Sequence, residues 1–258
     1  MLLAPSRSAM IGGMGATQDG ILIAVEGIDG AGKTTQVERL RAALAAAGET
    51  VVASKEPTSG KWGQRIRESA QHGRMALDQE LHAFTEDRRE HIAKIKPALD
   101  RGDIVLLDRY FYSTIAYQGA RGADPVKIGN AMRAEFPIPD LVLLIDLHPA
   151  EALERISVSR GETPNHFERL DSLQAIRQRF LDIAKDDPTI QQINGSDGIE
   201  AVYQAAMHIV LNGVLKAKRC AKSYDCDVFY CSYRINGECR WANLYGQLNR
   251  GRQSSVPA

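Results

Sequence analysis

Short apolar runs alternate with longer amphipathic stretches along most of the chain. Five runs of strand length read, in chain order, ILIAVE, TVVAS, DIVLLD, LVLLID and TIQQING. The stretches between them that predict helices are 33–47, 77–100, 149–160 and 199–210. Buried parallel strands joined by crossover helices give this alternation. The pattern predicts a three-layer α/β domain over residues 20–212, with a five-stranded parallel sheet flanked by helices.

Residues at the ends of these stretches agree with their assignment as helices. Gly48 and Gly102 follow the first two, and Pro149 occupies the first turn of the third. Asp146 precedes that third helix and is interpreted as its cap, and Ser196 and Asp197 are the expected caps of the last. One side of the last helix carries Ile199, Val202, Tyr203, Ala206, Ile209 and Val210.

Length and composition indicate a folded chain with a large core. The chain has 258 residues, of which 44% are hydrophobic and 25% charged, which suits one large domain with or without an appendage. No run reaches the ~18 apolar residues that a membrane span needs. The apolar stretch within 1–19 is too short for a signal peptide, so these residues are interpreted as a flexible leader. A cytosolic location with reduced thiols is therefore expected.

The composition changes abruptly near residue 213. From there to the C-terminus there are eight basic residues against three acidic ones, although the whole chain has zero net charge. All four cysteines and six of the sixteen aromatic residues also lie in this part. We therefore expect one folded domain at 20–212 and a basic, cysteine-rich C-terminal extension at 213–258.

A glycine-rich motif follows the first predicted strand. Residues 27–34 fit G-x-x-x-x-G-K-[ST], and the strand before and the helix after give the context that a P-loop requires. Backbone amides of such a loop converge on phosphate oxygens, while the lysine reaches the outer phosphates and the hydroxyl ligates Mg²⁺. The predicted ATP-binding residues are Gly27, Ile28, Asp29, Gly30, Ala31, Gly32, Lys33, Thr34 and Thr35.

P-loop proteins also place a carboxylate near the magnesium ion, at the end of a neighbouring strand. Asp108 ends the run IVLLD and is the candidate, although an acid in this position can also be a helix cap. Arg109 follows it directly. A cation beside the metal-binding acid is where a second phosphate would bind.

Four segments together resemble the thymidylate kinases, a family of P-loop nucleoside monophosphate kinases. They are EGIDGAGKTTQ, KEPTSGKWGQRIR, LHAFTEDRREHIAKIKPALDRGDIVLLDRYFYSTIAYQGARG and PDLVLLIDLHPAEALERI followed by RGETPNHFE. These segments cover most of residues 21–185 in the family's order and spacing. The resemblance implies transfer of phosphate from Mg-ATP to dTMP, and it implies a homodimer.

The resemblance also implies an acceptor site. Arg109 would bind the dTMP phosphate, Phe84 would stack on thymine and Arg88 would donate to a base carbonyl. Tyr117 would crowd the 2′ position and favour deoxyribose, and Thr114 would face the base edge. The remaining implied residues are Glu56 and Pro57, which shape the acceptor pocket, and Asp29, which lies near the transferred phosphate.

Several of these residues have a plainer interpretation from the sequence alone. Phe84 has helical spacing with Leu81 and could belong to the core. Arg88 lies in the charged run EDRRE, for which a solvated helix face is the ordinary expectation.

A lid over ATP is implied at about residues 155–168. No arginine occupies the variable loop positions from Ile28 to Ala31. This resembles the family subgroup in which lid arginines stabilise charge in the transition state, which makes Arg155 and Arg160 the implied candidates. The sequence PNHFE departs from the family's lid, which has an aspartate before FE. Arginines on a helix can also be plain surface charge.

The expected mechanism needs no general base. A nucleotide phosphate, with a second pKa of ~6, is already largely anionic near neutral pH. Catalysis then consists of in-line positioning and charge neutralisation by Lys33, Mg²⁺, Arg109 and the lid arginines. Two alternatives stay open: a kinase for dUMP or a modified pyrimidine deoxynucleotide, and a P-loop switch or nucleic-acid-binding ATPase. The absence of an N-K-x-D segment argues against a GTP switch.

The C-terminal extension spaces its cysteines as C-x₅-C-x₄-C-x₇-C. Four thiols in a short segment suggest Zn²⁺ bound by Cys220, Cys226, Cys231 and Cys239. This spacing lacks C-x₂-C pairs, and disulfides or free cysteines are the alternatives. Basic residues interleaved with aromatic ones would also suit contact with nucleic acid or a partner protein.

Overall fold

The computed structural model describes residues 20–160, 169–220, 234–235 and 238–239. Its main sheet contains β1 (Ile21–Glu26), β2 (Val51–Lys55), β3 (Ile104–Asp108), β4 (Leu141–Asp146) and β5 (Ile190–Asn194). The strands are all parallel and lie in the order β2-β3-β1-β4-β5. The predicted fold class is confirmed. The central strand β1 is buried along its whole length, as its uninterrupted apolar run predicts.

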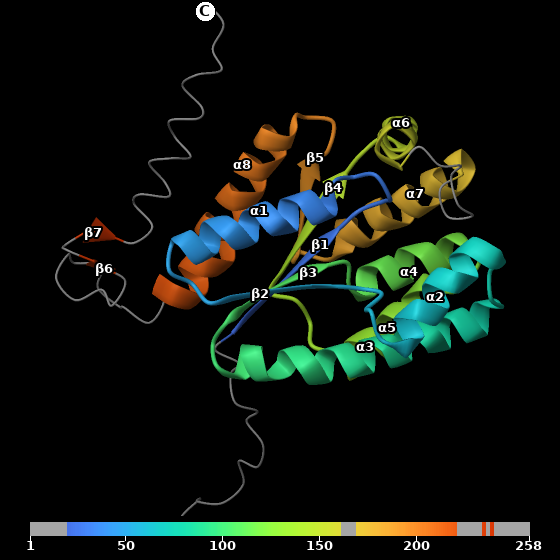
Figure 1. Cartoon of the computed structure of the whole chain (residues 1–258), viewed down its shortest axis with the longest axis horizontal. Helices are drawn as coiled ribbons and strands as arrows, with labels where there is room; N and C mark the ends of the chain where they lie inside the picture. Colours follow the sequence, from blue (N-terminus) through green and yellow to red (C-terminus); the bar gives the residue numbers. More distant parts are fainter. Residues whose placement is uncertain (1–19, 161–168, 221–233, 236–237, 240–258) are drawn as a thin grey trace, which may run out of the picture.

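Helices cover both faces of this sheet (Figure 1). Helices α1 (Lys33–Ala46) and α8 (Ile199–Val210) lie together on one face, while α3 (Leu77–Asp100), α4 (Phe111–Ala120) and α5 (Pro125–Glu135) lie on the other. Helix α7 (Leu170–Asp186) packs along α4, and α2 (Lys61–His72) packs along α3. Helix α6 (Pro149–Arg160) follows β4. The result is the expected arrangement of three layers.

Four helices were not predicted from the sequence: α2, α4, α5 and α7. Helix α4 has nine buried residues among its ten, so it lacks the polar face that makes a helical period visible. Helix α5 does carry a start signal, since Asp124 accepts hydrogen bonds from the amides of Val126 and Lys127 and Pro125 is its first residue.

Three predicted helix caps are wrong. The N-cap of α8 is Gly198 and no side chain caps it, so neither Ser196 nor Asp197 has that role. The Asp146 carboxylate accepts two hydrogen bonds from Arg177 of α7, at 2.6 and 2.9 Å. Asp146 therefore binds a partner that the tertiary structure brings close, which local sequence patterns do not reveal.

Helix α8 continues into a π-helix, η1 (Leu211–Cys220), past the predicted boundary at residue 213. Leu211 and Leu215 are buried in the same core as the sheet. Lys218 binds the Asp140 carboxylate at 2.7 Å and the Gly20 carbonyl at 2.8 Å. Packed structure therefore extends to at least Lys218.

Beyond η1 the described part of the extension is a two-stranded antiparallel sheet of β6 (Arg234–Ile235) and β7 (Glu238–Cys239). The leader at 1–19 lies outside the described residues. Within the residues that the structure describes, no helix combines the length and hydrophobicity needed to cross a bilayer.

Candidate active site

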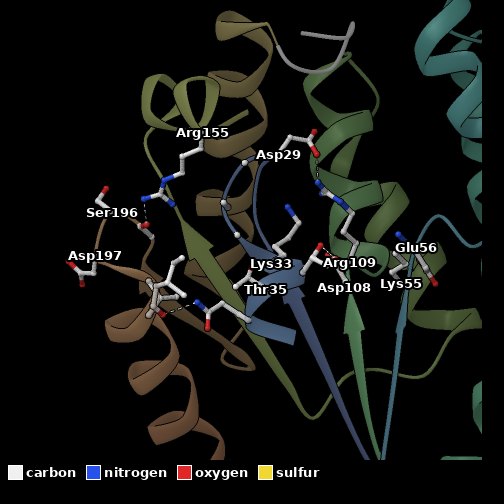
Figure 2. A pocket seen from close by; sticks show the side chains of 18 of the residues that line it. Asp29, Lys33, Thr35, Lys55, Glu56, Asp108, Arg109, Arg155, Ser196 and Asp197 are labelled. Carbon is white, nitrogen blue, oxygen red and sulfur yellow. Dashed lines mark hydrogen bonds and ion pairs between the residues drawn. The ribbon is translucent and has the colours of Figure 1, made fainter. Parts of the chain in front are cut away.

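A cavity of about 860 Å³ opens at the carboxyl-terminal edge of the sheet. Its lining includes the glycine loop after β1, the ends of β2 and β3, and the loop between β5 and α8 (Figure 2). In this sheet β3 and β4 flank β1 on opposite sides, so the chain leaves β1 at a switch point. Ligands of open α/β sheets bind at that place.

The glycine loop has the backbone shape of a phosphate cradle. Gly30 has φ of 80°, and a Cβ there would lie 2.5 Å from the Ala152 carbonyl oxygen, so only glycine fits. Gly32 has φ of 87° and is the N-cap of α1, with no side chain capping the helix. The first amides of α1 and its positive dipole end therefore face the cavity, which fits bound phosphate.

Lys33 lies across the loop. Its Nζ donates to the Ile28 carbonyl at 2.7 Å, and the residue is only 6% exposed. Burial, together with the positive charge of Arg109, lowers the pKa of Lys33 to about 8, although Asp29 and Asp108 oppose this change. An anion in the cavity would stabilise the charged form of Lys33.

Thr34 and Asp108 place two oxygen ligands side by side. The Thr34 hydroxyl donates to the Asp108 carboxylate at 2.5 Å, and Asp108 pairs with Val25 in the sheet register. An oxygen pair next to a phosphate cradle fits Mg²⁺, which prefers carboxylates, hydroxyls and phosphate oxygens. The contact of Asp108 with Thr34 supports its interpretation as part of a metal site.

Arg109 joins the glycine loop to the turn after β3. It has φ of 71°, in the left-handed region, and its guanidinium donates to Asp29 at 2.6 Å, to the Gly27 carbonyl at 3.2 Å and to Ser113 at 3.1 Å. Burial opposes the charge, but Tyr117 and the nearby carboxylates outweigh burial and raise the pKa of Arg109. Arg109 is therefore a permanent cation at the cavity.

Tyr117 contacts both Asp29 and Arg109. Its hydroxyl donates to the second oxygen of Asp29 at 2.9 Å, and the Arg109 guanidinium lies 5.2 Å from its ring centroid. Asp29 thus connects a residue of α4 and a residue of the β3–α4 turn to the glycine loop.

Arg88 is 1% exposed, so it does not lie on a solvated helix face. It donates twice to the Glu56 carboxylate, at 2.9 and 2.6 Å, and once to the Thr114 hydroxyl at 2.9 Å. The structure thereby brings together three predicted acceptor-site residues that are far apart in the sequence. Phe84, one helical turn before Arg88, is partly exposed and is not among the core residues.

His91 was missed by the sequence reasoning. Its Nδ1 lies 2.9 Å from the other oxygen of Glu56, and its Nε2 lies 2.7 Å from the Ser54 hydroxyl. Burial would raise the pKa of Glu56, but Arg88 and His91 outweigh burial and lower it. Glu56 is therefore an ionised carboxylate that orients Arg88.

The predicted acceptor residues divide into two groups. Glu56, Pro57 and Arg109 line the cavity, whereas Phe84, Arg88, Thr114 and Tyr117 do not. The second group is connected to the cavity through the Arg88–Glu56 and Tyr117–Asp29 hydrogen bonds.

Other residues of interest were not singled out from the sequence. Arg67 lines the cavity and donates to the Pro57 carbonyl at 2.9 Å. The loop at 195–199 lines its other end. Gln118 is fully buried on α4, and its side-chain amide has no hydrogen-bond partner among the described residues. The sequence alone does not distinguish a buried glutamine whose side-chain amide lacks hydrogen-bond partners from one whose amide has them.

Arg155 also lines the cavity, and its guanidinium donates to the Gly195 carbonyl at 2.9 Å (Figure 2). Arg160 ends α6, but its side chain and residues 161–168 lie outside the described residues. Cys226, Cys231 and the side chains of Cys220 and Cys239 also lie outside them.

Comparison with known proteins agrees with this geometry. Residues 25–206 match the family model for thymidylate kinase. The thymidylate kinase of Xanthomonas oryzae pv. oryzae (strain PXO99A) is 47% identical over 193 residues, which span 74% of this chain and 83% of the relative. The thymidylate kinase of Xylella fastidiosa (strain M12) is 45% identical over 193 residues, spanning 74% of this chain and 87% of that relative. The chain belongs to the thymidylate kinase family.

Proposed function

We propose that this chain transfers the γ-phosphate of Mg-ATP directly to the phosphate of dTMP, giving dTDP for DNA precursor synthesis. The observation that carries the proposal is the position of Arg109. This partly buried cation binds the glycine loop through Asp29 and lies beside Tyr117 of the predicted acceptor site. A nucleotide phosphate at Arg109 would therefore lie next to the γ-phosphate held by the loop.

On the donor side, the loop amides and the start of α1 bind the phosphates, and Lys33 neutralises their charge. Thr34 and Asp108 would hold Mg²⁺, which lowers the energy of the charged transition state when it is bound. Arg155 reaches the cavity from α6 and is proposed, with Arg160, to add positive charge to the transferring phosphate.

On the acceptor side, Arg109 and Arg67 provide two cations at the cavity wall for the dTMP phosphate. The acceptor oxygen is already anionic near neutral pH, because the second pKa of a phosphate monoester is ~6. The proposed site therefore aligns two phosphates and neutralises them without a general base.

For the base and sugar, we propose that Phe84 stacks on thymine, that Arg88 donates a hydrogen bond to the base and that Tyr117 excludes a 2′-hydroxyl. Thr114 is proposed to face the base edge. Gln118 follows Thr114 by one helical turn, and its unpartnered buried amide can both donate and accept, as a base edge requires.

A coupled ADP-release assay with dTMP, dUMP, dCMP and dGMP at fixed Mg-ATP tests the proposal. We expect dTMP to give the highest kcat/KM. Equal ADP release with and without any nucleotide would contradict the kinase function, and a preference for dUMP would reassign the acceptor. Arg109→Ala tests the site itself, since wild-type kcat and KM for dTMP in that variant would contradict its assignment to the acceptor phosphate.

A homodimer and a cytoplasmic location are proposed from family membership, and sedimentation velocity tests the first. A Cys₄ zinc site in the extension is proposed from the sequence alone. Metal analysis of freshly reduced protein tests it, and a zinc content well below one per chain contradicts it, because stable sites of this kind are fully occupied.

A further inference from the structure

Glu26 is a buried acid to which the proposed mechanism gives no role. It is the last residue of β1, directly before the glycine loop, and its exposure is 0%. Buried carboxylates are costly unless they are hydrogen-bonded or paired, so its partners indicate what it stabilises.

Those partners are Tyr110 and Ser113, which lie just after Arg109 at the start of α4. One oxygen of Glu26 accepts from the backbone amides of Tyr110, at 2.8 Å, and Ser113, at 3.2 Å. The other accepts from the Ser113 hydroxyl at 2.6 Å. Tyr110 is the N-cap of α4 and makes no side-chain capping bond. The Glu26 carboxylate, at the end of β1, therefore caps the N-terminus of α4. A negative charge at that end of the helix also interacts favourably with the helix dipole.

The same contacts stabilise the conformation of Arg109. A non-glycine residue with φ of 71° is strained unless its surroundings fix it. Here the Arg109 amide donates to the Val25 carbonyl at 3.0 Å and the next amide donates to Glu26. Two consecutive amides of the turn are thus bound by two consecutive residues of β1.

A side-chain relay extends this contact to the guanidinium. The Ser113 hydroxyl gives its only proton to Glu26, so its oxygen is free to accept from Arg109 Nη1, 3.1 Å away. The relay therefore runs from the Glu26 carboxylate through Ser113 to the cation.

We propose that Glu26 is a positioning residue for the acceptor phosphate, because it holds the β3–α4 turn and orients Ser113 so that the Arg109 guanidinium points into the cavity. This role rests on the proposed binding of the acceptor phosphate by Arg109. Glu26 itself touches no reacting atom.

The electrostatics of Glu26 make this role sensitive to pH. Burial raises its pKa to about 7, although Ser113 and the positive charge of Arg109 oppose this change. The other cation that acts on it is Lys33 at the start of α1, and the acids Asp29 and Asp108 act on both cations. A protonated Glu26 donates to Ser113 instead of accepting from it, and the relay to Arg109 is then reoriented.

A double-mutant cycle with Glu26→Gln and Arg109→Ala tests the role in the full-length protein. Glutamine keeps the size of Glu26 but donates to Ser113, as the protonated acid does. We expect Glu26→Gln to raise the KM for dTMP about tenfold, the effect of losing one charge-assisted hydrogen bond, and to leave the KM for ATP within about twofold. In the Arg109→Ala background the same substitution should change the KM for dTMP less than about twofold.

An equal effect of Glu26→Gln in both backgrounds would overturn the proposal, since Glu26 would then act only on the fold. The pH profile is a second readout. Wild-type kcat/KM for dTMP should rise through pH of about 7, whereas Glu26→Gln should follow only the titration of dTMP itself at ~6. Identical profiles would also overturn the proposal.

A wild-type KM in Arg109→Ala alone contradicts the assignment of Arg109 to the acceptor phosphate, and the ADP-release assay tests the kinase function independently. A raised KM in Arg109→Ala with a wild-type KM in Glu26→Gln contradicts only the positioning role. If Glu26→Gln does not fold by circular dichroism, Ser113→Ala replaces it, because it breaks the relay but keeps both backbone bonds to Glu26. We expect a severalfold higher KM for dTMP in Ser113→Ala, and an unchanged KM contradicts the relay.

Discussion

The Arg109 guanidinium forms an ion pair with the Asp29 carboxylate, with 2.6 Å between Nη2 and Oδ1. The two residues are 80 positions apart, one in the glycine loop and one after β3. Since Arg109 is the proposed acceptor-phosphate ligand, Asp29 competes with that phosphate for the same cation. The pair therefore couples the donor and acceptor halves of the site.

Replacing Asp29 by asparagine should free Arg109 from this competition. We expect dTMP to bind about threefold to fivefold more tightly, with the gain decreasing at high salt because the pair is partly exposed. Isothermal titration calorimetry at two ionic strengths measures this. Asp78→Asn removes the same charge from the exposed first turn of α3 and should leave dTMP affinity unchanged. Weaker dTMP binding in Asp29→Asn would contradict the competition.

Removing the Tyr117 hydroxyl should weaken discrimination against ribose. Tyr117→Phe keeps the ring but loses the hydrogen bond that fixes it to Asp29. A hydrogen bond to a charged group contributes about 1.5–3 kcal/mol, so we expect the ratio of kcat/KM for dTMP over ribothymidine monophosphate to fall about tenfold or more. An unchanged ratio would show that Tyr117 does not set sugar choice.

ATP binding should be accompanied by proton uptake near pH 8. The pKa of Lys33 is lowered to about 8, so part of the free enzyme carries a neutral Lys33 there, and the bound triphosphate favours its charged form. Calorimetry in buffers of different ionisation enthalpy measures the uptake. Lys33→Met should abolish it, and uptake that persists in that variant would contradict the assignment.

The same lowered pKa has a consequence for stability. Between about pH 8 and 10.5 the unfolded chain binds more protons at Lys33 than the folded one. The contribution of Lys33 to the free energy of unfolding therefore rises with pH in that window. Urea denaturation of wild type and Lys33→Met at pH 8 and pH 10 measures this contribution of Lys33 to the free energy of unfolding.

Removing the Glu56 carboxylate should destabilise the fold. Arg88 is fully buried, and without Glu56 it becomes a buried cation without its counter-ion. We expect Glu56→Ala to cost about 3–5 kcal/mol of unfolding free energy. The exposed Lys96–Asp100 pair is the matched control, and Asp100→Ala should cost less than about 1 kcal/mol. Equal losses in the two variants would contradict the structural importance of the Glu56–Arg88 pair.

Asp108→Asn should weaken magnesium binding. The Asp108 carboxylate accepts a hydrogen bond from the Thr34 hydroxyl and so orients this oxygen, which is a proposed metal ligand. Loss of an orienting carboxylate typically weakens metal affinity 10–100-fold, so activity should require correspondingly more Mg²⁺ at fixed ATP. A magnesium titration of initial rates measures the shift, and an unchanged half-saturating concentration would exclude Asp108 from the metal site.

Local patterns were sufficient for the sheet and the glycine loop. All five strands were predicted. The buried strands β1, β3 and β4 are continuous apolar runs, whose signal does not depend on their neighbours. Helix α4 was missed because it is buried on all sides, so its sequence lacks the alternation of polar and apolar faces that reveals a helix. The caps Asp146, Ser196 and Asp197 were wrong. Asp146 binds Arg177 and Ser196 donates to Glu151, partners that the fold brings close, whereas Asp197 accepts from Asn194 three residues earlier.

The sequence by itself determined the fold class, the phosphate cradle and the family, because each depends on residue types at fixed spacing. The tertiary structure decided which charged residues are buried and what they bind. Arg88 and Arg89 are neighbours in one charged run, yet Arg88 is buried on Glu56 and Arg89 lies exposed on Glu86 and Glu135. The coupling of Glu26, Ser113, Arg109 and Asp29 likewise exists only where β1, β3 and α4 meet, because its strength depends on burial and distance in space.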